Sequence, residues 1–404
     1  MAIKSSTKSN LILVLVSTIM ALVLLEGASR LFYYLRWGEL YDSQWMRYSM
    51  RLGWELQPGS YLRFDINQQG FRRPTDVSLE VPENTVRVFL VGGSTAFGTN
   101  GLYPQFDPVP LEYEDTIDYH MQKILQDRYP GLNFEVINAG VSESRLYQEI
   151  TLFREKLLNF DPDLVVFLDG HNDISFLTLG SSISEWAAPY WNTRHTDRGA
   201  RVLNSSSVMG PFYYADIYLG RVSYFYYGMT SLLQELQNLA GGEADESNPR
   251  WGSDSFRIAD EAQLVQKYAE QLQDLDEVLP LYLDQLGDLA AIATARKAKV
   301  LYALQPELVI EEPAQLSARD TAIQNFTFQH HGDFGTLGWR YMAPRISARL
   351  EKLSNEYFRG MEMLTIADGS GENIYTDYCH LTSRGNQVVA ENLYPVVAEM
   401  LELK

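Results

Sequence analysis

Cysteine is almost absent from this chain: Cys379 is the only one, so no internal disulfide can form. Basic residues are also scarce, with 33 lysines and arginines against 52 acidic residues and a formal net charge of −19. A surface this acidic repels phosphate backbones, so nucleic acid is not an expected partner. The sequence has no phosphate loop, no dinucleotide-binding fingerprint and no metal-ligand spacing of histidines, so neither a cofactor nor a metal is expected.

Two groups that could bind or react are interpreted as structural. Cys379 directly precedes His380, and adjacent side chains on an extended or turning backbone generally point apart, so Cys379 is predicted to be a packing residue. The pair His330-His331 is interpreted as part of a solvated loop.

The longest apolar run lies near the N-terminus, from Leu11 to Leu25, and follows Lys4 and Lys8. A membrane-spanning helix needs about 20 residues, and the segment continues with Glu26 and Arg30, which stand at i and i+4 and can pair. Several aromatic residues follow between Phe32 and Trp37, as in the aromatic belts at membrane interfaces.

Residues 1–37 are therefore predicted to be a cytoplasmic tip and an uncleaved membrane anchor. A signal peptide cleaved after Ser29 is the alternative. The two N-terminal lysines place the start of the chain in the cytoplasm and the remainder outside, although two arginines beyond the run weaken this orientation.

The remaining chain divides into an arm at residues 38–85, which is polar, turn-rich and aromatic, and a domain at residues 86–404. In this domain predicted strands occur at Val86–Val91, Phe134–Ile137, Leu164–Leu168 and Val300–Leu304, with a weaker one at Met363–Ile366. Predicted helices occur at Asp115–Arg128, Leu146–Leu158 and Gly385–Leu401. The alternation predicts an α/β fold of three layers, in which helices cover both faces of a mainly parallel five-stranded sheet.

A large insertion, at about residues 174–298, interrupts the alternation. Its first part is rich in aromatic residues between Trp186 and Tyr227. Its second part has one apolar stripe at helical spacing from Val265 to Ala293. Pro280 lies within the stripe and predicts a kink or two consecutive helices. We expect the stripe to pack on the chain's own sheet, with a coiled-coil dimer as the alternative.

Four short blocks carry groups with chemical potential: Gly92–Gly98, Asn138–Gly140, Gly170–Asp173 and Asp377–Thr382. The first three directly follow predicted strands. In an open α/β sheet, ligands bind at the edge formed by the carboxyl ends of the strands. The blocks are therefore expected to meet at that edge.

Together the blocks supply the groups needed for acyl transfer through a serine ester. A serine such as Ser94 needs a base, and a base needs an orienting group, which His380 and Asp377 can provide. A tetrahedral oxyanion needs preorganised donors, which the N–H groups of Ser94 and Gly140 and the side-chain amide of Asn172 can provide.

Each block taken alone also has a structural explanation. Ser94 could cap a helix after a glycine-rich turn, and an Asp-x-x-His pair is common on surfaces and at helix ends. Asn172 could be a turn residue and Gly140 a left-handed turn. The order of the blocks along the chain and their place at strand ends favour catalysis. Asp173 is interpreted as a structural hydrogen-bond acceptor.

The order Ser, Gly, Asn, His resembles the SGNH hydrolase superfamily, also called GDSL-like lipases and esterases, from the first predicted strand to the C-terminus. The anchor and arm are similar to bacterial membrane-anchored members. The resemblance implies a flavodoxin-like fold with Ser94 as nucleophile and with Asp377 and His380 as acid and base. It also implies an oxyanion hole formed by Ser94, Gly140 and Asn172.

Two positions depart from the family pattern. The familiar Gly-Asp-Ser is here Gly92-Gly93-Ser94, which removes a carboxylate from the turn. The second block lacks the additional glycine often found after it.

The resemblance implies a serine esterase outside the cytoplasm that hydrolyses or transfers acyl groups, with O-acetyl groups on a cell-surface or extracellular glycan as the expected substrate. A lipase or thioesterase, and a non-catalytic polysaccharide-assembly or binding protein, are the alternatives. The aromatic part of the insertion could be a sugar-stacking lid, an acyl groove or a buried core.

Overall fold

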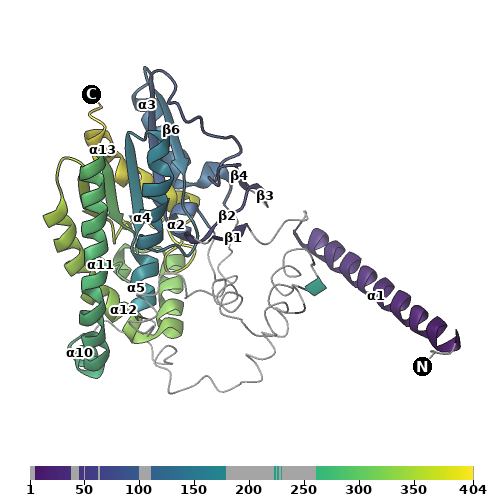
Figure 1. Cartoon of the computed structure of the whole chain (residues 1–404). Helices are drawn as coiled ribbons and strands as arrows, with labels where there is room; N and C mark the ends of the chain where they lie inside the picture. The colour runs from purple at the N-terminus through teal and green to yellow at the C-terminus, as the bar shows by residue number, and fades with distance from the viewer. Residues whose placement is uncertain are drawn as a thin grey trace. The chain divides into compact units, whose positions relative to one another are not determined.

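The computed structural model describes residues 5–37, 45–49, 51–61, 64–99, 111–178, 223, 225–226, 229 and 261–403. The chain forms two compact units, one of residues 1–45 with 197–244 and one of residues 46–196 with 245–404. Figure 1 shows the chain with its elements labelled. Most of the aromatic stretch expected to form a lid or groove lies outside the described residues.

The first unit contains α1 (Ser5–Trp37). Its stretch Ile12–Phe32 is long and apolar enough to cross a membrane. The predicted pairing of Glu26 with Arg30 is confirmed, with 2.7 Å between Oε1 and Nε. Ser223 Oγ also donates to the same carboxylate at 2.8 Å. The one acidic side chain in the apolar stretch is thus hydrogen-bonded within its own unit, as a carboxylate in an apolar environment requires.

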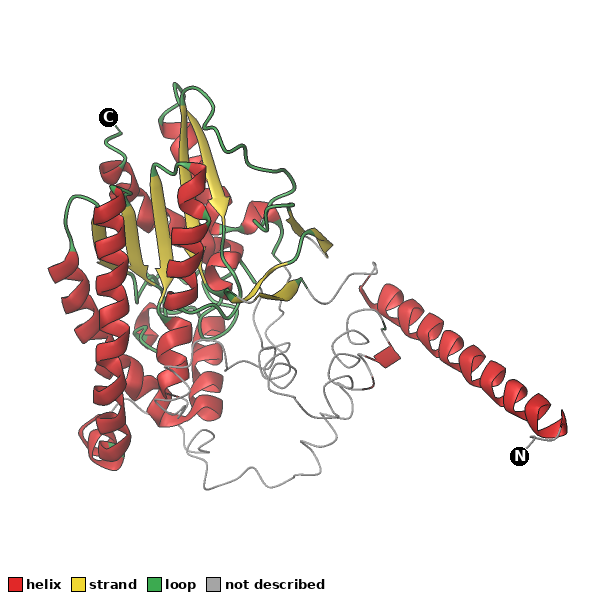
Figure 2. Ribbon diagram, in the orientation of Figure 1, coloured by secondary structure: helices red, strands yellow, loops and turns green. Residues whose placement is uncertain are grey.

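The second unit is built on a five-stranded parallel sheet in the order β6-β5-β7-β8-β9. The strands are β5 (Thr85–Gly92), β6 (Asn133–Asn138), β7 (Leu164–Asp169), β8 (Val300–Leu304) and β9 (Phe358–Glu362). This order is the flavodoxin-like one. Figure 2 shows the strands side by side between layers of helices. The predicted three-layer α/β fold is confirmed.

Helices cover both faces of this sheet because its inner strands are apolar on both sides. Val88 and Leu90 of β5 pack with α3 (Ile117–Arg128) and α13 (Ser383–Met400). Phe89 and Val91 face the opposite layer. That layer contains α4 (Leu146–Glu155), α10 (Glu261–Lys267), α11 (Ala269–Arg296) and α12 (Ala318–Leu353).

The arm carries two small hairpins and holds the first block from outside the sheet. The hairpins pair β1 (Met46–Ser49) with β2 (Gly53–Leu56) and β3 (Gly59–Tyr61) with β4 (Phe64–Ile66). The buried Arg72 donates to the carbonyl oxygens of Phe97, Gly98 and Leu111. Phe97 ends α2 (Ser94–Phe97), the short helix that begins with the candidate nucleophile. The arm therefore braces the far end of that helix.

The fifth strand lies earlier in the chain than predicted. It spans Phe358–Glu362 rather than Met363–Ile366. Because β9 pairs only with β8 at the edge of the sheet, its residues after Phe358 are at least partly exposed and include charged side chains. The apolar residues 363–366 follow the strand, and the Met363 N–H still donates to Leu304 O at 3.0 Å. The strand was predicted at residues 363–366 because they are mostly apolar, but these apolar residues are buried without pairing as a strand.

Pro280 does not separate two consecutive helices, which was one of the two outcomes predicted for it. The helix α11 runs through Pro280, and the separation from α10 falls at Tyr268 instead. Pro280 is exposed, so its ring faces away from the packed stripe, which includes Leu279 and Tyr282. The stripe packs on the chain's own sheet as expected, against residues that include Tyr302.

The helix α12 was not predicted, and His330-His331 lies in it rather than in a loop. Its sequence contains three glycines and Pro344, all poor helix formers. Its buried apolar residues, among them Trp339 and Ile346, join the cluster that covers one face of the sheet. Packing outweighs the low propensity here.

Candidate active site

The first three blocks meet at one edge of the sheet. The strands β5, β6 and β7 end at Gly92, Asn138 and Asp169, and each block begins there. Gly92 has φ 152°, a conformation that side chains rarely adopt, and a Cβ there would lie 2.1 Å from Leu168 O. The chain can therefore turn directly from the strand into α2, with Ser94 as its first residue.

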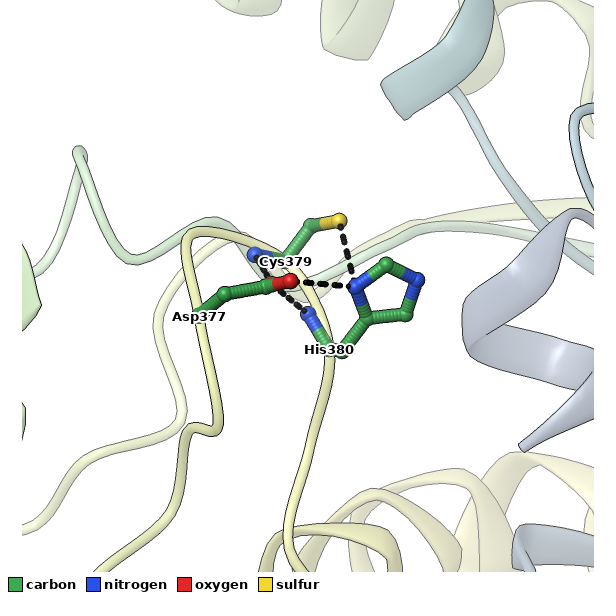
Figure 3. Close-up of side chains that lie close together, drawn as sticks. All are labelled: Asp377, Cys379 and His380. Atoms are coloured by element: carbon green, nitrogen blue, oxygen red, sulfur yellow. Dashed lines mark hydrogen bonds and ion pairs between the residues drawn. The ribbon is translucent and has the colours of Figure 1, made fainter. Parts of the chain in front are cut away.

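Ser94, His380 and Asp377 form a continuous hydrogen-bonded row. His380 Nε2 lies 2.8 Å from Ser94 Oγ, although 286 positions separate them in the sequence. On the other side of the ring, Nδ1 lies 2.7 Å from Asp377 Oδ2. Figure 3 shows the imidazole turned toward that carboxylate. In such a row an imidazole oriented by a carboxylate can activate a serine hydroxyl.

Hydrogen bonds hold the Asp377 carboxylate and tie its loop to the residue that follows Ser94. The N–H groups of Cys379 and His380 donate to Asp377 Oδ1 at 2.9 and 2.8 Å. Thr95, next to Ser94, donates through Oγ1 to Cys379 O at 3.2 Å. The two halves of the candidate triad are thus joined by a second bond besides that between Ser94 and His380.

The electrostatics suit a general base. Burial alone would lower the pKa of His380, but the charge and hydrogen bond of Asp377, and then the charge of Glu307, raise it above its ordinary value. Burial would raise the pKa of Asp377, but the charge of His380 and hydrogen bonds from the ring and two backbone N–H groups bring it well below its usual range. Asp377 is therefore ionised when His380 accepts a proton.

Asn172 lies directly against the turn at Gly93, next to Ser94. A Cβ built on Gly93 would lie 2.4 Å from Asn172 Nδ2, so Gly93 leaves the space that this amide occupies. Nδ2 donates to Ser144 O at 2.7 Å, which fixes the amide plane and leaves its second N–H for another acceptor. The absence of aspartate from the familiar Gly-Asp-Ser thus has a steric reason in this chain.

Gly140 is also packed against α2, since a Cβ there would lie 2.6 Å from Phe97 N. Its N–H, however, donates to Asn138 Oδ1 at 3.0 Å. The Gly140 N–H can serve an oxyanion only if that bond is shared or released. Asp173 is an acceptor as predicted, because its Oδ2 receives the Leu146 N–H at 2.9 Å.

We expect Gly93→Ala to lower kcat for ester hydrolysis, the reaction proposed below, by about 100-fold or more, the effect of losing one oxyanion donor. The added methyl group would displace the Asn172 amide, with which it would overlap. Steady-state kinetics of the full-length variant would measure the change. Gly131→Ala is a matched control, because a Cβ at Gly131 meets nothing within 4 Å. Parental kcat in Gly93→Ala would show that the Asn172 amide has no part in turnover.

Cys379 is buried, as expected of a packing residue, but its side chain does not point away from His380. Sγ lies 3.7 Å from His380 Nδ1. Figure 3 marks this contact with a dashed line. Among the described residues, Asp377, Cys379 and His380 form the group close enough to share a metal ion. Burial and the charges of Asp377 and Glu307 raise the pKa of the Cys379 thiol, which disfavours the thiolate that a metal prefers. The polar atoms of this group instead bond one another and Ser94.

Sequence reasoning gave no role to Glu307 or His171, which lie beside these residues. Glu307 Oε1 is hydrogen-bonded to His171 Nδ1. Only their places in the sequence could have indicated that they lie near the site. Glu307 follows β8 at the same edge of the sheet, and His171 precedes Asn172.

No family model and no curated protein sequence matches the chain. Solved structures that match include a GDSL-like lipase from Bacteroides thetaiotaomicron at 12% identity, covering 80% of this chain and 92% of that one with a TM-score of 0.33. A member of the lipolytic G-D-S-L family from Veillonella parvula matches at 10% identity over 77% of this chain and 97% of that one, with a TM-score of 0.37.

A carbohydrate acetylesterase from Sinorhizobium meliloti matches at 14% identity, covering 78% of this chain and 99% of that one with a TM-score of 0.34. The candidate site is assigned from its own geometry.

Proposed function

We propose that the protein is a serine esterase of the SGNH type. The observation that carries the proposal is the hydrogen-bonded row from Ser94 Oγ through the His380 ring to Asp377. All three residues are at the carboxyl edge of the sheet or on the loop that meets it, where an open α/β sheet binds ligands. A glycine-rich turn with a capping serine would not need an imidazole and a buried carboxylate aligned behind the hydroxyl.

In the proposed reaction Ser94 Oγ attacks the ester carbonyl while His380 Nε2 takes its proton. The Ser94 N–H and the Asn172 amide stabilise the oxyanion. The protonated ring then gives the proton to the leaving alcohol, which leaves an ester on Ser94. A water molecule, or a sugar hydroxyl in a transferase, then attacks that ester while His380 Nε2 takes its proton. The bond between the acyl group and Ser94 Oγ breaks, the acyl group leaves on the attacking oxygen, and His380 returns the proton to Ser94.

The proposed substrate is an O-acetyl ester of a cell-surface or extracellular glycan, reached by a domain that α1 anchors outside the cytoplasmic membrane. The apolar helix supports the anchor. The substrate class follows from the resemblance of the four blocks to SGNH esterases and is an analogy between families.

The test compares acyl groups on the full-length protein in detergent. We expect turnover of 4-nitrophenyl acetate and release of acetate from acetylated xylan, and much slower turnover of the dodecanoate ester. Faster turnover of the long-chain ester would favour the lipase alternative. A parent protein that hydrolyses no ester, with Ser94→Ala as the background control, would favour the non-catalytic alternative.

A further inference from the structure

A second imidazole and carboxylate lie beside the triad. His171, the first residue of α5 (His171–Thr178), shares a hydrogen bond between its Nδ1 and Glu307 Oε1. Glu307 is 1% exposed and His171 is 8% exposed. A carboxylate so deeply buried needs a compensating partner, and the imidazole provides it. The proposed chemical steps use neither side chain.

This pair is not a second nucleophilic triad. Ser175 Oγ lies 3.1 Å from His171 Nε2 but also 3.5 Å from Nδ1. Because it is almost equally far from both ring nitrogens, the hydroxyl lies beside the ring and not in line with the Nε2 lone pair. An activated serine needs that alignment.

His171 contacts the loop that carries the candidate acid and base, and the residue that follows Glu307 is hydrogen-bonded to the same loop. The His171 ring stacks on Tyr378, with 5.1 Å between centroids and 26° between planes. Tyr378 lies between Asp377 and His380 in the chain. Next to Glu307, the Leu308 N–H donates to Tyr378 O at 3.0 Å. Trp339 of α12 also stacks on His171, at 6.1 Å and 24°.

We propose that Glu307 and His171 position the loop Asp377–His380, and that the Glu307 carboxylate adds a second negative charge to the surroundings of the general base. The inference rests on the proposed function, since it concerns the same serine esterase site. His171 is adjacent to Asn172, so it also links the amide that faces the oxyanion to the loop that carries the base. Glu307 and His171 are positioning residues, because neither touches the reacting atoms.

The charges around Glu307 agree with this role. The titratable groups that face it are His171 on α5, Tyr375 just before the loop, and Asp377, Cys379 and His380 of the loop. Burial raises the pKa of Glu307, and the adjacent His171 opposes that rise. The charge of Glu307 in turn helps to raise the pKa of His380, after the larger effect of Asp377.

Two substitutions separate charge from position. Glu307→Gln keeps an oxygen that can accept from His171 Nδ1 but removes the charge. The acid-side midpoint of the pH profile of kcat/KM, which follows the pKa of His380, should then fall by about half a pH unit. This is less than the shift that a carboxylate in direct contact with the imidazole produces. Glu307→Asp keeps the charge but is too short to reach His171. Its kcat should fall by about 10-fold while the midpoint stays at the parental value.

The matched control is Glu311→Gln, the same change at another carboxylate that is 1% exposed. Glu311 accepts from Tyr375 Oη at 2.8 Å and from Ile366 N at 2.7 Å, so this variant should lose thermal stability and keep the parental midpoint. All measurements use the full-length protein in detergent with 4-nitrophenyl acetate.

An unchanged midpoint in Glu307→Gln would overturn the role of the charge, and parental kcat in Glu307→Asp would overturn the positioning role. Either result with an active parent would leave the esterase proposal intact. A parent without ester turnover would remove the proposed function and this inference together.

Discussion

Ser94→Ala is expected to lower kcat/KM for ester hydrolysis by at least about 10⁴-fold, the loss found when a serine nucleophile is removed from a triad. The methyl group cannot form the covalent ester. The His380 Nε2 that lies 2.8 Å from Ser94 Oγ would have no hydroxyl to deprotonate. Residual turnover would come from the oxyanion donors and from binding alone.

A fluorophosphonate probe provides a second measurement, because it bonds covalently to an activated serine. The parent should be labelled at Ser94, as peptide mass mapping would show. Ser142→Ala is a suitable control, since Ser142 is a buried serine whose hydroxyl lies 3.1 Å from Thr99 Oγ1. It should be labelled like the parent. Equal labelling of Ser94→Ala and the parent would rule out Ser94 as the nucleophile.

The sequence predicts the position of the first three blocks well because short stretches of sequence determine where each strand lies and where it ends. β5 is mostly apolar and ends at Gly92, which a second glycine follows, so both its type and its end can be recognised. In a parallel sheet the carboxyl ends of neighbouring strands lie at one edge, which brings the blocks together without any knowledge of tertiary contacts. The prediction that Asp377 and His380 also lie at this edge depended instead on the order of the four blocks and on their resemblance to a known family.

Contacts between distant residues were not predictable in the same way. No local signal shows that Arg72 of the arm would donate to the carbonyl at the end of α2. Likewise, nothing in the sequence around Glu307 predicts a partner for its carboxylate. Only the folded chain places it against His171. The edge strand β9 and the glycine-containing α12 were missed because their partners in the fold, and not their own periodicity, stabilise them.

Asp377→Asn is expected to lower kcat by about 10⁴-fold, close to the effect of removing the nucleophile. The asparagine oxygen would still accept the N–H groups of Cys379 and His380, which now bond Asp377 Oδ1. Its NH₂ group would then replace Oδ2 opposite His380 Nδ1. An amide donor there favours the tautomer with the proton on Nε2, which cannot accept the proton of Ser94.

The same variant makes a prediction about pH. His380 must be neutral to act as a base, so activity is lost as pH falls through its pKa, which lies above the ordinary 6.5 in the parent. Asp377 is the main cause of that rise, so its replacement should move the acid-side midpoint of kcat/KM to lower pH even as activity falls. The control is Asp368→Asn, the same substitution at an exposed position that precedes Asp377 in the chain. It should change neither kcat nor the acid-side midpoint. A variant with parental kcat and midpoint would show that Asp377 does not orient the base.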